Sequence, residues 1–126
     1  ELVLEALAPT RIYVKPFLKL AQEMDVKAAV HVTGDAFLKF KRLNKGFYLN
    51  NFKPQRIFEL IQECGVGWKE MFKTFNMGWG FAVVVEKKAV DSALDLLERQ
   101  GVEAEEMGFV KGKNIVVKHK NKEIVL

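Results

Sequence analysis

The sequence has 126 residues, a net charge of +4 and 49% hydrophobic residues. This length suits one domain with a core of its own and is short for two. The composition is that of a globular protein and excludes a disordered or collagen-like chain, and no apolar run is long enough to span a membrane. Because no signal-peptide pattern opens the chain either, we expect a cytoplasmic protein.

The chain starts at Glu1 rather than at a methionine and continues into a largely apolar stretch, residues 2–7. We therefore expect it to be a fragment of a longer polypeptide. Residues 8–14 contain proline and β-branched side chains, which favours an extended segment. Pro16 then suits the first turn of a helix, and the helical spacing of apolar residues predicts that this helix ends near Asp25.

A short, mostly apolar strand follows at residues 27–32, and Thr33-Gly34-Asp35 ends it. Beyond this turn, apolar residues at helical spacing predict a short amphipathic helix. They are Phe37, Leu38, Phe40 and Leu43. The turn is therefore expected to join a strand to a helix.

The middle of the chain predicts a brief strand at residues 47–49 and then two helices. The first helix opens at Pro54 and closes at Gly65, and the second contains residues 68–75. The single cysteine, Cys64, excludes an internal disulfide and suits a reducing compartment. We expect its side chain to be buried as a small hydrophobic group.

A loop with two glycines precedes the most hydrophobic strand, residues 81–85, which we expect to be buried. Residues 91–100 are predicted to be helical, and Gly101 ends that helix. A loosely patterned strand at residues 102–110, a turn, and a returning strand at residues 115–118 together predict a hairpin.

The end of the chain is rich in lysine: Lys111, Lys113, Lys118, Lys120 and Lys122. These lysines fit a nucleic-acid-binding surface, but they fit the solvent face or edge of the hairpin better. Residues 123–126 suggest a last short strand. Because helices and strands are interleaved along the chain, we expect an α+β fold with a mixed or mostly antiparallel sheet.

The stretch His31-Val32-Thr33-Gly34-Asp35 combines several residue types that serve ligand sites. Alternation along a strand puts His31 and Thr33 on one face, and Gly34 lets the backbone approach a ligand. His31 then suits a proton carrier, and the start of the following helix suits an anion. In the alternative interpretation, which the spacing alone favours, Thr33 or Asp35 caps the helix and His31 is structural.

Two further stretches have a similar ambiguity. The glycines of residues 75–80 (FNMGWG) allow close approach to a ligand, or they make room for Phe75 and Trp79 in the core, which the composition favours. Arg11 suits a phosphate or carboxylate, although a structural ion pair is its more ordinary role.

The sequence predicts no metal centre and no nucleotide-binding loop. His31 and His119 lie far apart in the sequence, and one cysteine completes no metal site. Neither the P-loop pattern nor the glycine pattern of a Rossmann fold occurs.

Three stretches in this order carry a resemblance: residues 8–16 (APTRIYVKP), residues 31–34 (HVTG), and Met71 followed by residues 74–78 (TFNMG). They resemble the C-terminal half of the aminoimidazole ribonucleotide synthetase family, also called phosphoribosylformylglycinamidine cyclo-ligases. The resemblance covers most of the chain. It implies an α/β sandwich with a partial ferredoxin-like topology, and it implies that residues 1–126 form the C-terminal domain of a two-domain enzyme.

The resemblance implies a ligase of purine biosynthesis. In this family ATP phosphorylates the formyl amide oxygen of formylglycinamidine ribonucleotide, an amine closes the imidazole ring, and phosphate leaves. His31 is implied as the catalytic residue, and Arg11 stays a candidate for phosphate contact. Six residues are implied to contact the substrate: Thr33, Gly34, Asp35, Asn76, Met77 and Gly78.

The resemblance also sets expectations for partners. ATP and Mg²⁺ are expected mainly on an N-terminal domain outside this sequence, so the isolated chain is expected to be inactive and the full-length enzyme to be a homodimer. Where the family commonly has three consecutive glycines, this sequence has Gly34-Asp35-Ala36. This departure leaves one alternative open, a non-catalytic binding or regulatory module that kept the fold. The lysines near the C-terminus leave a second one open, a nucleic-acid-binding protein.

Overall fold

The computed structural model describes residues 1–126, in which helices and strands are interleaved. The α-helices are α1 (Leu2–Ala6), α2 (Val14–Glu23), α3 (Arg56–Glu63), α4 (Trp68–Thr74) and α5 (Val90–Arg99). The two 3₁₀ helices are η1 (Ala36–Leu43) and η2 (Lys87–Ala89). The strands are β1 (Val26–His31), β2 (Phe47–Leu49), β3 (Phe81–Val85), β4 (Gly108–Val110), β5 (Ile115–His119) and β6 (Lys122–Val125).

The strands form two sheets. β1 and β3 make an antiparallel ribbon, and the other four strands make a mixed sheet in the order β4-β2-β5-β6. Within the mixed sheet, β2 and β5 are parallel and the other neighbours are antiparallel. The predicted α+β class is confirmed. None of the helices has the length and apolar character needed to cross a membrane.

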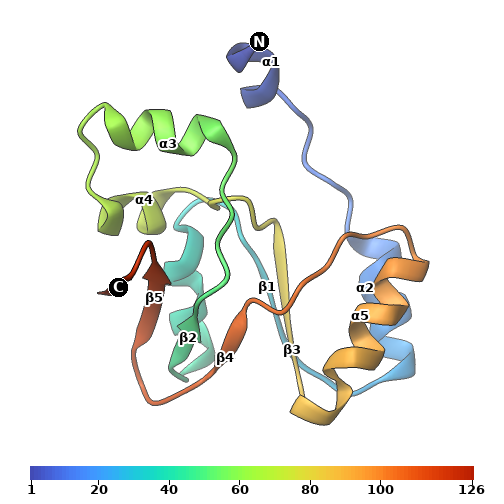
Figure 1. The fold of residues 1–126 in the computed structure, drawn as a ribbon. Helices are drawn as coiled ribbons and strands as arrows, with labels where there is room; N and C mark the ends of the chain where they lie inside the picture. Colours follow the sequence, from blue (N-terminus) through green and yellow to red (C-terminus); the bar gives the residue numbers. More distant parts are fainter.

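The β1-β3 ribbon is packed on both faces. Figure 1 shows α2 and α5 side by side next to this ribbon. Leu20 of α2 forms a small core with Ala93 and Leu96 of α5, and Val83 packs against this core from β3. On β1, Val30 belongs instead to the main core on the other side of the ribbon. The ribbon therefore separates the two cores.

The main core is rich in phenylalanine. Phe37, Phe40 and Phe72 are almost completely buried, and the ring centroids of Phe37 and Phe72 lie 5.9 Å apart. Burial of each such side chain contributes about 1.5–3 kcal/mol. Because Ala36 and Phe37 are both buried and directly follow the turn after β1, this packing fixes where the turn lies.

The predicted hairpin between residues 102–110 and 115–118 is wrong. β4 and β5 do not pair, because β2 lies between them. The loop from β4 to β5 crosses the start of β2, where Gly46 N–H donates to Gly112 O (3.0 Å) and Lys111 N–H donates to Gly46 O (2.9 Å). A Cβ at Gly46 would overlap the carbonyl oxygen of Lys111, so this crossing requires glycine.

β5 pairs instead with β6, which corresponds to the predicted last strand. The two strands join through Lys120 and Asn121, whose left-handed φ angles (48° and 62°) suit a two-residue hairpin turn. The five lysines at this end of the chain are all exposed: Lys111, Lys113, Lys118, Lys120 and Lys122.

Three other features differ from the expectations. Cys64 is exposed rather than buried, because it lies at the C-terminal end of α3, where the helix has reached the surface. Of the strand predicted at residues 102–110, only β4 forms. β3 is half-buried along its length rather than buried, since it pairs with β1 on one edge and with no strand on the other.

His119 of β5 lies among aromatic rings of the main core. The centroids of Trp68, Phe72 and Phe52 lie 4.8, 5.6 and 6.3 Å from its own. Its Nε2 is buried and has no hydrogen-bond partner. This loss of solvation lowers the pKa of His119 from its ordinary value, and the positive charge of Lys120 lowers it further.

This environment predicts a pH-dependent stability. Because the pKa of His119 is lower in the folded state, the unfolded chain binds more protons, and the free energy of unfolding falls as the pH falls through the unfolded pKa of about 6.5. A His119→Phe variant should lose this part of the pH dependence, whereas His31→Gln should keep it. Urea unfolding between about pH 5 and 7.5 measures it. Equal slopes for His119→Phe and the parent protein would contradict the assignment.

Candidate functional site

The register of the ribbon brings two of the candidate stretches together. His31, the last residue of β1, pairs with Phe81, the first residue of β3. One step further along, Val32 N–H donates to Gly80 O (3.0 Å). The turn that follows β1 and the loop that precedes β3 therefore lie side by side at one end of the ribbon.

The third stretch reaches the same end through Tyr13. The Tyr13 ring stacks on Phe81 at a centroid distance of 5.1 Å and meets the His31 ring edge-on at 6.0 Å. A Cβ at Gly80 would overlap the Tyr13 hydroxyl. Gly80 thus makes room for Tyr13 rather than for the aromatic residues of its own loop, which corrects the expectation from composition.

The predicted alternation along the end of β1 is confirmed. Val30 and Val32 are buried, whereas His31 and Thr33 are exposed on the opposite face. His31 lies against aromatic rings, and its own ring nitrogens have no hydrogen-bond partner in the protein. Both nitrogens are therefore free to bind a ligand.

Sequence reasoning missed Lys39, which lies on η1 beside this turn. Its ammonium donates to the Thr33 hydroxyl oxygen and to the His31 carbonyl oxygen (3.2 Å), and it belongs to none of the ion pairs. Because an ammonium only donates, the Thr33 oxygen accepts here and its hydroxyl proton stays free for a further acceptor. The available signal was a lysine six residues after Thr33 in a helix that starts directly at the turn.

The backbone of the turn is strained. Asp35 and Ala36 both have left-handed φ angles, 63° and 36°, which glycine adopts at lower cost. Neither Thr33 nor Asp35 caps η1 through its side chain, and the Ala36 N–H donates instead to the Thr33 carbonyl oxygen (2.8 Å). The alternative interpretation of this turn as a side-chain helix cap is therefore wrong.

The neighbouring loop is held by its own residues. Asn76 Oδ1 accepts a hydrogen bond from Gly78 N–H (3.0 Å), and Trp79 Nε1 donates to Asn51 O (2.8 Å). Met77 also has a left-handed φ of 51°, and its side chain is completely buried in the main core. Of the three residues implied here as substrate contacts, Gly78 is exposed and Asn76 half-buried. Met77 has no exposed surface and anchors the loop from within.

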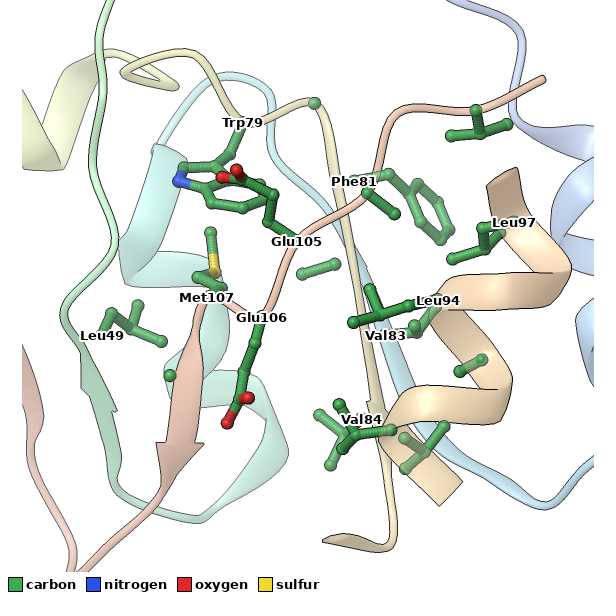
Figure 2. A pocket seen from close by; sticks show the side chains of 18 of the residues that line it. Leu49, Trp79, Phe81, Val83, Val84, Leu94, Leu97, Glu105, Glu106 and Met107 are labelled. Carbon is green, nitrogen blue, oxygen red and sulfur yellow. The ribbon is translucent and has the colours of Figure 1, made fainter. Parts of the chain in front are cut away.

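Arg11 does not form the expected structural ion pair. Its Nη1 donates to Gly101 O (3.1 Å), just beyond the C-terminal end of α5, where a positive charge is favourable. Arg11 and Tyr13 are among the residues that line an apolar hollow of about 1090 Å³, which all five residues of β3 also line. Figure 2 shows the part of this hollow between β3 and the segment that contains Glu105 and Glu106.

Comparison with known protein families matches residues 1–120 to AIR synthase related protein, C-terminal domain. The chain belongs to this family. This confirms the resemblance carried by residues 8–16, residues 31–34, and Met71 with residues 74–78.

Individual relatives of this chain are named phosphoribosylformylglycinamidine cyclo-ligase. The protein from Pyrococcus horikoshii is 46% identical over 121 residues, which cover 95% of the chain and 36% of the relative. The protein from Pyrococcus furiosus is 48% identical over 105 residues, covering 82% and 31%. The protein from Methanocaldococcus jannaschii is 40% identical over 138 residues, covering 97% and 39%. The domain thus spans about a third of the length of these relatives.

The close approach of Tyr13 to Gly80 predicts a specific sensitivity. Gly80→Ala should lower the free energy of unfolding by about 1–3 kcal/mol, because the new methyl group must push the Tyr13 ring away from Phe81. Gly34→Ala is the matched control. Since no atom lies within 4 Å of a Cβ at Gly34, its effect should stay within about 0.5 kcal/mol. Urea denaturation compares the two variants, and equal losses would contradict this account of Gly80.

Proposed function

We propose that this domain forms one wall of the substrate site of an ATP-dependent cyclo-ligase, which closes the imidazole ring of formylglycinamidine ribonucleotide to give aminoimidazole ribonucleotide. The main support is that three stretches far apart in the sequence meet at one end of the β1-β3 ribbon, through Tyr13, His31 and Gly80. The proposed reaction itself is taken from the family of the chain and from the names of its relatives.

His31 and Thr33 are assigned the direct contacts in this proposal. The exposed imidazole of His31 suits proton transfer to or from a bound substrate. The Thr33 hydroxyl, whose oxygen already accepts from Lys39, donates its proton to an acceptor oxygen of the substrate. The ammonium of Lys39, which forms no ion pair, adds a positive charge beside Thr33. This charge favours a phosphate or formyl oxygen there.

Strain in the turn supports a functional assignment. Asp35 and Ala36 are held in left-handed conformations that cost of order 1–3 kcal/mol each, and such strain clusters at ligand sites. The identity of these two residues supports a second candidate, a binding or regulatory module without catalysis. Asp35 and Ala36 stand where the family commonly has glycines. The two candidates differ in whether the bound ribonucleotide is turned over.

ATP and Mg²⁺ are assigned mainly to an N-terminal domain in this proposal. No three His, Cys, Asp or Glu side chains of this domain converge on a point where they could hold a metal ion. The proposal includes that the domain is inactive without its ATP-binding half. A homodimeric, cytoplasmic full-length enzyme stays part of the same proposal.

An amide NMR titration of the domain with formylglycinamidine ribonucleotide tests the site. We expect saturable shifts at residues 33–37 and 76–80. Lys39→Met should weaken this binding roughly ten- to hundredfold, the usual effect of losing a hydrogen bond to a charged group. Lys41→Met is the matched control, because Lys41 lies on the same helix, is exposed and does not contact the turn.

The outcomes separate the alternatives. No shifts in these two loops, even after addition of the N-terminal domain, would contradict the proposed site. Shifts without turnover by the two domains together with ATP would favour the non-catalytic module. Equal affinities of the Lys39→Met and Lys41→Met variants would remove Lys39 from the site while leaving the assignment of His31 and Thr33 in place.

A further inference from the structure

β3 has one bare edge. In an antiparallel pair the backbone groups of alternate residues point toward the partner strand. Because Gly80 O accepts from Val32 N–H, the N–H and C=O groups of Ala82 and Val84 face β1, and those of Phe81 and Val83 point away from it. No strand pairs with that outer edge. Unpaired, half-buried backbone groups of this kind favour the addition of a strand.

The apolar hollow lies directly along this bare edge. Its volume is about 1090 Å³. Phe81, Val83 and Leu94 line it on one side, and Met107 lines it on the other. Ala104 also lines it. The hollow therefore separates β3 from a segment of the same chain by a gap that apolar side chains border on both sides.

That segment, residues 102–107, has the pattern of a strand, and its last residue is bonded to a neighbouring stretch of main chain: Met107 O accepts from Asn50 N–H (3.1 Å) and Asn51 N–H (3.3 Å), just after β2. It belongs to no helix or strand, and it leads directly into β4. Val102 and Ala104 are half-buried, whereas Glu103 and Glu105 are exposed, which is the alternation of a half-buried strand.

The direction of the segment also fits. α5 connects β3 to this segment, and Figure 2 shows the chain running the same way along β3, from Phe81 to Val84, and along the segment, from Glu105 to β4. A strand, a helix and a second strand parallel to the first form a common unit whose two strands pair. β3 and β4 are also the end strands of their sheets.

Polar contacts hold the segment on the far side of the hollow. Glu105 accepts hydrogen bonds from Lys53 Nζ (3.0 Å) and Asn51 Nδ2 (3.1 Å), and Asn51 Nδ2 also donates to Glu106 O (2.9 Å). These contacts are exposed, and exposed contacts of this kind are weak. Together, the contacts of Glu105 with Lys53 and Asn51 form the tether of this segment. Since Asn51 O also accepts from Trp79 Nε1, the tether is connected to the loop beside His31.

We propose that residues 102–107 act as a strap that closes onto the bare edge of β3. Closure pairs the strap with Phe81 and Val83, removes the apolar walls of the hollow from water, and joins the two sheets into one sheet in the order β1-β3-β4-β2-β5-β6. Glu105 and its partners Asn51 and Lys53 set the balance between the open and the closed arrangement. Through Asn51 and Trp79, closure shifts the loop that precedes β3.

Residue-resolved amide hydrogen exchange on the 126-residue chain tests the strap. Glu105→Ala should slow exchange at Phe81 and Val83 about two- to fivefold, because loss of the tether favours the closed arrangement by an amount typical of exposed contacts. Glu103→Ala is the matched control, an exposed acid on the same segment, and should leave both rates unchanged. Ala82 and Val84, which are bonded to β1, should keep their rates in both variants.

A second variant tests the tether without changing a residue of the segment 102–107. Lys53→Met removes the tether from the other side and should slow the same two amides. Unchanged or faster exchange at Phe81 and Val83 in both tether variants would overturn the strap. Slowing that increases with protein concentration would overturn it as well, because the added strand would then come from a second copy of the chain.

Discussion

The pairing of His31 with Phe81 decides which side chains of the β1-β3 ribbon enter a core and which face outward. In this register Val30 and Val32 are buried and His31 and Thr33 are exposed. Since side chains alternate along a strand, a slip of one residue would bury His31 and Thr33 and expose the two valines. The apolar cores on the two faces of the ribbon therefore hold the candidate site in place.

The same ribbon explains why distant stretches of sequence meet. Antiparallel pairing puts the end of β1 beside the start of β3, and α2, which packs on the ribbon, brings Tyr13 to that end. Gly80 is the contact point, because its missing side chain leaves space for the Tyr13 hydroxyl. The glycine-containing loop thus serves the geometry of the site through packing, and Met77 fixes that loop from inside the core.

Local features of the fold could be predicted from the sequence, whereas the pairing of distant strands could not. Helical spacing located α2, α3, α4 and α5, and alternation predicted how His31 and Thr33 face. The predicted hairpin of β4 and β5 was wrong, because their closeness in the sequence does not reveal that β2 lies between them. The loop from β4 to β5 crosses β2 at Gly46, where no side chain would fit. Lys39 was missed for a different reason: its contact with Thr33 is close in the sequence but depends on how η1 folds back at a strained turn.

Turnover and thermal stability of a His31→Ala variant, measured together in the proposed two-domain enzyme, test the central assignment most directly. His31 is exposed and contributes little to a core, so the melting temperature should change by only a few degrees, roughly the effect of 1 kcal/mol or less. Loss of a proton-transferring group should lower turnover by about a hundredfold or more. Parallel, moderate losses of turnover and stability would contradict the account and make His31 a structural residue.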